Sequence, residues 1–69
     1  MTQQDLVRRF ILQFRRPFNR KLVCEMTDVP LETVNGVMRT MLAEGNIKCI
    51  CEDEEIYVYA HRYDFKLVN

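Results

Sequence analysis

The hydrophobic residues of this 69-residue chain change their spacing once, close to Gly45. Before this point apolar residues recur every three or four positions, which predicts helices, and after it they recur at every second position, which predicts strands. A chain of this length buries only about 60% of the surface that it exposes when unfolded, so all its elements must share one thin core. We therefore expect a single domain over residues 1–69, of the α+β class and mainly α.

The first helix is expected to begin after Thr2 and to end at Arg16. Thr2 and Asp5 have the spacing of a capping box, and Pro17 disfavours helical geometry in the residue before it. The apolar stripe of this helix consists of Leu6, Val7, Phe10, Ile11 and Phe14.

Two further helices are predicted on either side of the turn Asp28-Val29-Pro30, in which Asp28 tolerates the left-handed conformation and Pro30 prevents continuation. Asn19 is a favourable N-cap for a helix over about 20–27. The third helix should cover 31–44 and close at Gly45. We expect the second helix to turn Leu22, Val23 and Met26 inward, and the third to turn Val34, Val37, Met38, Met41 and Leu42 inward.

Residues 47–60 are predicted to form a β-hairpin across the charged turn Asp53-Glu54. The alternation places Ile47, Cys49, Cys51, Ile56, Val58 and Ala60 on the core-facing side. Apolar and polar residues also alternate over residues 63–68, and two structures are possible for this segment. This segment forms a further strand beside an aromatic face used for self-association, or it folds back and completes the core.

Two stretches resemble a known family. Residues 28–34 read Asp-Val-Pro-Leu-Glu-Thr-Val, and residues 37–47 read Val-Met-Arg-Thr-Met-Leu-Ala-Glu-Gly-Asn-Ile. They are similar to the turn and the recognition helix of winged helix-turn-helix proteins, the IclR-like and MarR-like DNA-binding domains. The resemblance covers roughly residues 20–60 and implies three helices followed by a β-hairpin wing, with helix 31–44 in the major groove of double-stranded DNA.

The resemblance also implies DNA-binding roles for individual residues. Asn35 would pair with adenine and Arg39 with guanine, and Gly36 would allow the helix backbone to approach the bases closely. Arg20 and Lys21 would contact phosphates. The complete set of DNA-binding candidates is Thr33, Asn35, Gly36, Arg39, Thr40, Arg20 and Lys21. The alternative is that these are ordinary solvated residues of two surface helices.

The charge distribution conflicts with simple DNA docking. The net charge is zero, but residues 1–24 carry +5 and residues 25–55 carry −6. The acidic wing Glu52-Asp53-Glu54-Glu55 would meet phosphate and be repelled. Either the wing stays clear of the duplex, or the surface binds something else, such as a basic protein.

Two hypotheses of function follow. The first is a small DNA-binding transcriptional regulator that acts as a homodimer, because one such domain reads only a few base pairs. The second is a winged-helix protein-interaction module that uses Glu52, Asp53, Glu54 and Glu55 or a face formed by Tyr57 and Tyr59.

Enzyme chemistry is not expected. The chain has no Ser, no Gly-rich phosphate loop and a single histidine, so a nucleophile, a base and an orienting group cannot be assembled. Cys24, Cys49, Cys51 and His61 lack the usual spacing of a metal site, and we expect no metal and no cofactor. Neither a signal peptide nor a membrane span is recognisable, so we expect a cytoplasmic protein, or a nuclear one in a eukaryote.

Overall fold

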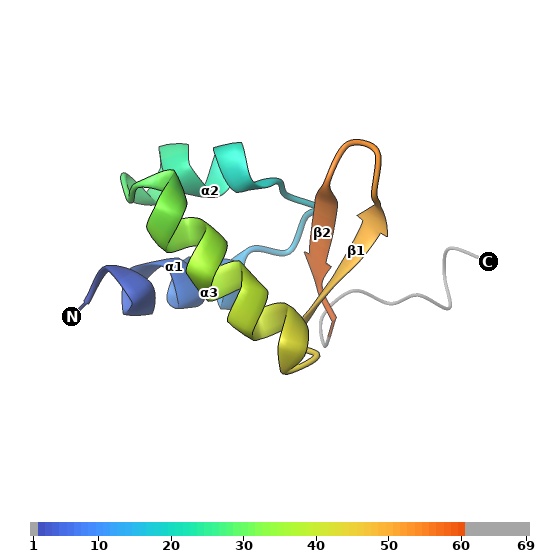
Figure 1. Ribbon diagram of the computed structural model, residues 1–69, viewed down its shortest axis with the longest axis horizontal. Helices are drawn as coiled ribbons and strands as arrows, with labels where there is room; N and C mark the ends of the chain where they lie inside the picture. Colours follow the sequence, from blue (N-terminus) through green and yellow to red (C-terminus); the bar gives the residue numbers. More distant parts are fainter. Residues whose placement is uncertain (1, 61–69) are drawn as a thin grey trace.

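A computed structural model describes residues 2–60 of the protein. Three helices are followed by a two-stranded antiparallel sheet, a winged-helix-like topology of the α+β class and mainly helical (Figure 1). The elements are α1 (Gln3–Gln13), α2 (Arg20–Thr27), α3 (Leu31–Ala43), β1 (Ile47–Cys51) and β2 (Ile56–Tyr59). The predicted order of elements is confirmed. His61 and the strand or fold-back expected over 63–68 lie outside the described residues.

Helix α1 begins with the predicted capping box and ends earlier than predicted. The Thr2 hydroxyl accepts a hydrogen bond from the Asp5 amide at 3.1 Å, and the Asp5 carboxylate accepts one from the Thr2 amide at 3.4 Å. The helix stops at Gln13 and not at Arg16, because Phe14 adopts an extended conformation and its ring packs edge-on against Phe18. Leu6 was expected inside but is 43% exposed, since α1 turns Val7 and Ile11 to the core.

Helix α2 has the predicted bounds and caps, but one side chain faces the other way. The Asn19 side chain accepts a hydrogen bond from the Leu22 amide at 2.7 Å, and Asp28 ends the helix in the left-handed conformation, with φ of 56°. The buried face is centred on Val23, with Thr27 one turn later donating to the Val23 carbonyl at 2.6 Å. Met26 lies off this face and is 61% exposed, so its predicted inward orientation is wrong.

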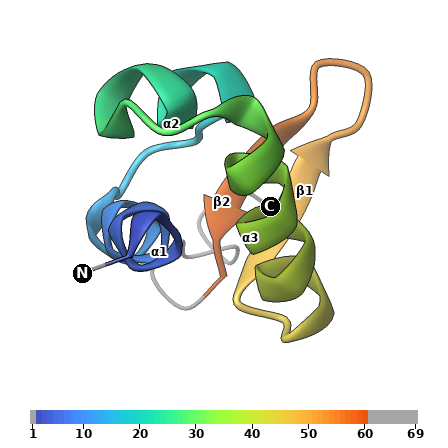
Figure 2. The ribbon, with the colours of Figure 1, turned by 60° about the vertical axis from the view of Figure 1, so that its left-hand side comes forward.

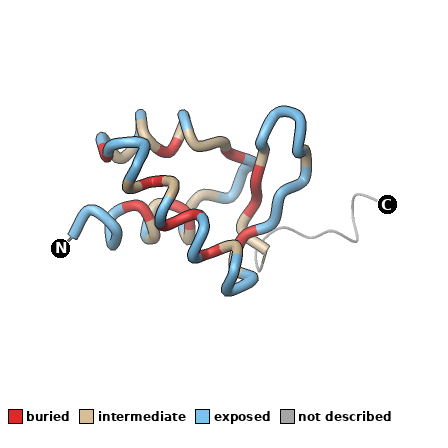
Figure 3. The backbone as a smooth tube through the Cα atoms, viewed as in Figure 1, coloured by how far each residue is buried: buried red, intermediate tan, exposed pale blue. Residues whose placement is uncertain are grey.

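Helix α3 supplies the largest share of the core. As predicted, Val34, Val37, Met38 and Met41 are buried, whereas Leu42 is half-buried. The helix ends at Ala43, where the amides of Gly45 and Asn46 donate to the carbonyls of Leu42 and Met41 in the Schellman pattern, with Gly45 at φ of 79°. The buried segments of α1, α2, α3 and β2 face one another, and the hairpin tip is exposed (Figure 3).

The sheet has a third, single-residue partner. The backbone of Phe18, between α1 and α2, pairs with Tyr57 on the edge of β2 that faces away from β1. Phe18 is 1% exposed and Tyr57 is 6% exposed, and their rings stack with centroids 6.3 Å apart. This pairing attaches the hairpin to the three helices.

The strict alternation predicted for the hairpin is wrong at several positions. A register shift lies between Cys49 and Cys51, and Cys49 is exposed where the pattern placed it inside. Cys51, Ile56 and Ala60 are half-buried. On β2 the neighbours Tyr57 and Val58 are both buried, although successive residues of a strand point to opposite faces. Tyr57 packs with Phe18 in the core formed with the helices.

Candidate nucleic-acid interface

The outer side of α3 is free over its whole length within the described part of the chain. Helix α3 lies across α1 and α2, and no other element of residues 2–60 covers this side (Figures 1 and 2). Its exposed residues are Leu31, Glu32, Gly36, Arg39, Thr40 and Ala43. An exposed helix with this many polar residues can enter a groove or contact a protein surface.

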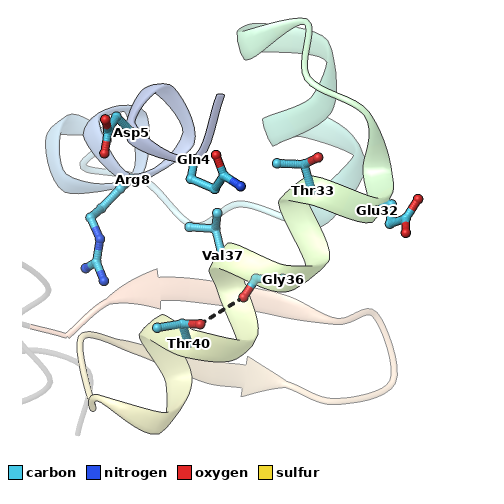
Figure 4. A pocket seen from close by; sticks show the side chains of 8 residues that line it. All are labelled: Gln4, Asp5, Arg8, Glu32, Thr33, Gly36, Val37 and Thr40. Carbon is cyan, nitrogen blue, oxygen red and sulfur yellow. Dashed lines mark hydrogen bonds between the residues drawn. The ribbon is translucent and has the colours of Figure 1, made fainter. Parts of the chain in front are cut away.

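Two hollows flank α3 and divide the predicted DNA-binding residues between them. The first, of about 500 Å³, lies between α3 and the first turns of α1. Figure 4 shows the side chains of Thr33 and Val37 pointing toward Gln4 of α1 and the side chain of Glu32 pointing away. The first hollow is lined by Gln4, Asp5, Arg8, Glu32, Thr33, Gly36, Val37 and Thr40. The second, of about 540 Å³, is lined by Arg20, Leu31, Asn35, Arg39, Leu42 and Glu55.

Gly36 lies in the middle of α3 with open space in front of it. A Cβ atom built at this position would meet nothing within 4 Å. Glycine in a helix interior costs about 1 kcal/mol relative to alanine. Packing among residues 2–60 therefore gives no reason for glycine here. The neighbouring Thr40 hydroxyl donates a hydrogen bond of 3.1 Å to the Gly36 carbonyl, so this threonine is partly engaged by its own helix.

Asn35 does not point freely outward as predicted. The residue is half-buried, and its Oδ1 atom is buried without a hydrogen-bond partner among the described residues. A buried, unpaired carbonyl oxygen costs about 1–3 kcal/mol. The side chain lies in the second hollow because α3 rotates Val34 and Met38 into the core and carries Asn35 to their border. Its amide is thus not fully presented for base pairing.

The two cations at the start of α2 differ in their surroundings. The Arg20 guanidinium lies 2.9 Å from a Glu55 carboxylate oxygen and 5.1 Å from the centre of the Tyr57 ring. Lys21 is exposed and has no ion pair within residues 2–60. Arg20 is thus occupied by the wing, and Lys21 is open to an external anion.

The hairpin tip is acidic and exposed as predicted, but Tyr57 and Tyr59 do not form the predicted exposed face. Glu52, Asp53, Glu54 and Glu55 are all exposed, and Glu55 adopts the left-handed conformation with φ of 54°. Tyr57 is only 6% exposed, and half-buried Tyr59 packs against the core. The prediction that the Tyr57 and Tyr59 rings form an exposed partner surface is therefore wrong, because Phe18 and Arg20 cover the Tyr57 ring.

A second ion pair joins the N-terminal helix to the end of α3. Arg8 donates to Glu44 at 2.8 Å, and the side-chain Nδ2 of Asn46 donates to the same carboxylate oxygen at 3.0 Å. The hydrogen bond from Arg8 has the largest effect and lowers the pKa of Glu44 below its usual value of 4.5, assisted by the positive charge of Arg8 and the bond from Asn46.

Part of the positive charge carried by residues 1–24 lies away from α3. Arg9, Arg15, Arg16, Lys21 and Arg39 have no ion pair within the described residues. Arg15 and Arg16 belong to the link between α1 and α2, which lies across the helical bundle from the outer side of α3 (Figure 2). Of the unpaired cations, Arg39 is the one carried by α3 itself.

No three His, Cys, Asp or Glu side chains in the described part of the chain are grouped to hold a metal ion, and Cys24, Cys49 and Cys51 are free thiols. No helix within residues 2–60 combines the length and the apolar character needed to cross a membrane.

Comparison with family models, with curated proteins and with solved structures found no match to this chain.

Proposed function

We propose that the protein binds double-stranded DNA by inserting the outer side of α3 into the major groove, in the manner of IclR-like and MarR-like winged-helix regulators of transcription. The topology supports this, because α3 is the second helix of a helix-turn-helix unit and is followed directly by the hairpin. The major groove, about 12 Å wide, admits an α-helix whose outer side is free.

Gly36 is the observation that carries the proposal. It lies in a helix interior at a position where the fold tolerates a side chain, so the stability that glycine costs there is not offset by packing within residues 2–60. A base edge or sugar–phosphate backbone that approaches α3 closely provides the missing reason. The open space at Gly36 is flanked by Thr33 and Thr40, whose hydroxyls can bond to either.

Arg39 and Lys21 supply the charge in this arrangement. Arg39 is exposed one turn after Gly36 and is free to form a bidentate contact with guanine. Lys21 lies at the start of α2, where a phosphate would be neutralised. The wing tip stays outside the contact, since its carboxylates would be repelled by phosphate. A single domain covers few base pairs, so the proposal includes a second copy on a second half-site.

The test is the binding of a fluorescently labelled mixed-sequence duplex, followed by anisotropy at increasing salt. We expect log K to fall linearly with log salt concentration. Arg39→Ala should weaken binding by about 1–3 kcal/mol. Arg16→Ala is the matched control, because Arg16 is also exposed and has no ion pair within residues 2–60 but lies in the link across the bundle from α3. It should change the affinity less than Arg39→Ala.

A second variant separates folding from binding. Gly36→Ala should raise the melting temperature, because alanine stabilises a helix interior by about 1 kcal/mol and meets no atom here. It should also weaken DNA binding, because the added methyl group holds the duplex away. Absence of binding at low salt would refute the proposal, as would a more stable Gly36→Ala variant that binds DNA like the wild type.

A further inference from the structure

The ion pair between Arg20 and Glu55 joins the start of α2 to the wing tip. The guanidinium Nη1 atom lies 2.9 Å from a carboxylate oxygen of Glu55, and 35 residues separate the two in the chain. The side chain of Arg20 is 27% exposed and that of Glu55 is 66% exposed. Because the cation is largely enclosed, salt screens its charge less than that of a fully exposed arginine.

The ring of Tyr57 fixes the position of the Arg20 guanidinium. The Cζ atom of Arg20 lies 5.1 Å from the ring centre, which is a cation–π contact. Tyr57 is itself buried, and its backbone exchanges two hydrogen bonds with Phe18. None of these contacts involves Glu55. Arg20 can therefore stay on the ring while its anionic partner is exchanged for another.

Glu55 has a backbone conformation that does not favour glutamate. Its φ is 54°, and its amide donates a hydrogen bond of 3.2 Å to the Glu52 carbonyl across the turn of the hairpin. Residues with a Cβ atom adopt this left-handed region at a cost, whereas glycine adopts it freely. The turn by itself therefore gives no reason for a glutamate at this position, and the contact of its carboxylate with Arg20 gives one.

The ion pair lies beside the proposed DNA contact. Arg20 and Glu55 both line the hollow of about 540 Å³ that is bordered by Asn35 and Arg39 of α3. They also line an adjoining hollow of about 520 Å³ together with Lys21. Of the three cations that line these hollows, Arg20 alone has an ion pair within residues 2–60. A duplex held by Arg39 and Lys21 would therefore bring phosphates close to a cation that a carboxylate already occupies.

We propose that Glu55 is an internal competitor for Arg20, which a phosphate of bound duplex DNA replaces. This inference rests on the proposed function, because the replacing anion belongs to the DNA backbone. In the free protein the Glu55 carboxylate accepts the hydrogen bond from Arg20, and in the complex a phosphate oxygen accepts it. The wing thereby lowers the affinity for DNA, because the form with a free Arg20 is only a fraction of the unbound protein.

The test compares two variants that each remove one carboxylate from the wing tip. Glu55→Gln frees Arg20, whereas Glu54→Gln removes an exposed charge that has no ion pair within the described residues. Binding of the labelled mixed-sequence duplex is measured by anisotropy at low salt. We expect Glu55→Gln to bind about fivefold more tightly than the wild type, and Glu54→Gln to gain less than about twofold.

A double-mutant cycle tests whether the gain acts through Arg20. Arg20→Gln should weaken the Glu55→Gln variant about tenfold, because it then removes a phosphate contact, but the wild type only about twofold, because Glu55 competes for the same cation. In the Arg20→Gln background, Glu55→Gln and Glu54→Gln should each change the affinity by less than about twofold. Circular dichroism and the melting temperature of each variant show whether it is folded.

The results that would overturn this inference differ from those that would overturn the proposed function. Equal gains from Glu55→Gln and Glu54→Gln show that the wing tip acts only through its total charge. A gain from Glu55→Gln that persists in the Arg20→Gln background shows that Glu55 repels the duplex directly. Both results overturn the inference and leave the proposed function in place, because the wild type still binds DNA. Absence of binding by the wild type at low salt overturns both.

Discussion

Phe18 and Tyr57 exchange two backbone hydrogen bonds, in which the Phe18 amide donates to the Tyr57 carbonyl at 2.9 Å and the Tyr57 amide donates back at 2.8 Å. The two residues lie far apart in the chain, one in the link between α1 and α2 and the other in β2. Their rings stack at an interplanar angle of 30°, and Phe14 meets Phe18 edge-on. This contact holds the wing against the three helices.

Replacing Phe18 should therefore lower the free energy of unfolding more than replacing any exposed apolar residue does. Phe18→Ala empties a site that is 1% exposed, and the expected loss of unfolding free energy is about 3–5 kcal/mol. Ile50→Ala is the control, since Ile50 is 42% exposed on β1 and should change stability by less than about 0.5 kcal/mol. Urea unfolding followed by circular dichroism measures both. A Phe18→Ala variant within 1 kcal/mol of the wild type would show that the pairing contributes little.

The turn before α3 depends on the left-handed backbone of Asp28, which has φ of 56°. Alanine pays roughly 1–2 kcal/mol in this conformation, whereas glycine adopts it freely. Asp28→Ala should lower the melting temperature, and Asp28→Gly should leave it unchanged or raise it. If both variants lowered the melting temperature equally, the side chain of Asp28, and not its backbone conformation, would be what stabilises this turn.

The ion pair between Arg8 and Glu44 predicts a pH dependence on the acid side. The hydrogen bond from Arg8 lowers the pKa of Glu44 in the folded protein below 4.5, so the pair stabilises the fold above that value. This stabilisation is lost as the pH falls through the lowered pKa. Wild type and Glu44→Gln should thus differ in stability at pH 7 and converge once the pH lies below the lowered pKa of Glu44. The difference at pH 7 should be small, because both side chains are partly exposed.

Urea unfolding at several pH values measures the effect of this ion pair. Arg8→Gln is the matched variant, and it should remove the same stabilisation over the same pH range. The double variant should lose no more than either single one. A difference that does not diminish at any pH below 4.5 would contradict the assignment to this carboxylate.

The three free thiols should react at different rates. Cys49 is exposed on β1, while Cys24 and Cys51 are half-buried. Iodoacetamide should therefore modify Cys49 first, as followed by mass spectrometry of peptides from the folded protein. Cys49→Ser should remove the fast phase and leave the slower ones. Faster labelling of Cys24 than of Cys49 would contradict this order of exposure.

Features that depend on a few adjacent residues were predictable. The capping box at Thr2, the caps at Asn19 and Asp28, and the closing Gly45 are each set by one side chain and the nearest backbone, and all are confirmed. The inward face of α3 was predictable for the same reason, because a helix repeats its own geometry and a run of buried positions follows from the spacing.

The winged-helix-like order of elements was also predictable, but the exposed and buried sides of short elements were not. Met26, Cys49 and Tyr57 were all assigned to the wrong side. An eight-residue helix or a five-residue strand with a register shift has too few residues for its spacing to define a face. Contacts with Phe18, which no local pattern indicates, decided the burial of Tyr57.

Which arginines are free to bind a partner was decided by the tertiary structure alone. Nothing in the sequence distinguishes Arg8 and Arg20 from Arg16 and Arg39. In the structure, however, Arg20 is paired with Glu55, 35 residues further along the chain, and Arg8 with Glu44, 36 residues further along. A local pattern reports which residues share a helix face, because neighbours along the chain are held at fixed distances. It carries no information on which distant carboxylate folding brings to a given cation, and this pairing determines which cations remain free to bind a partner.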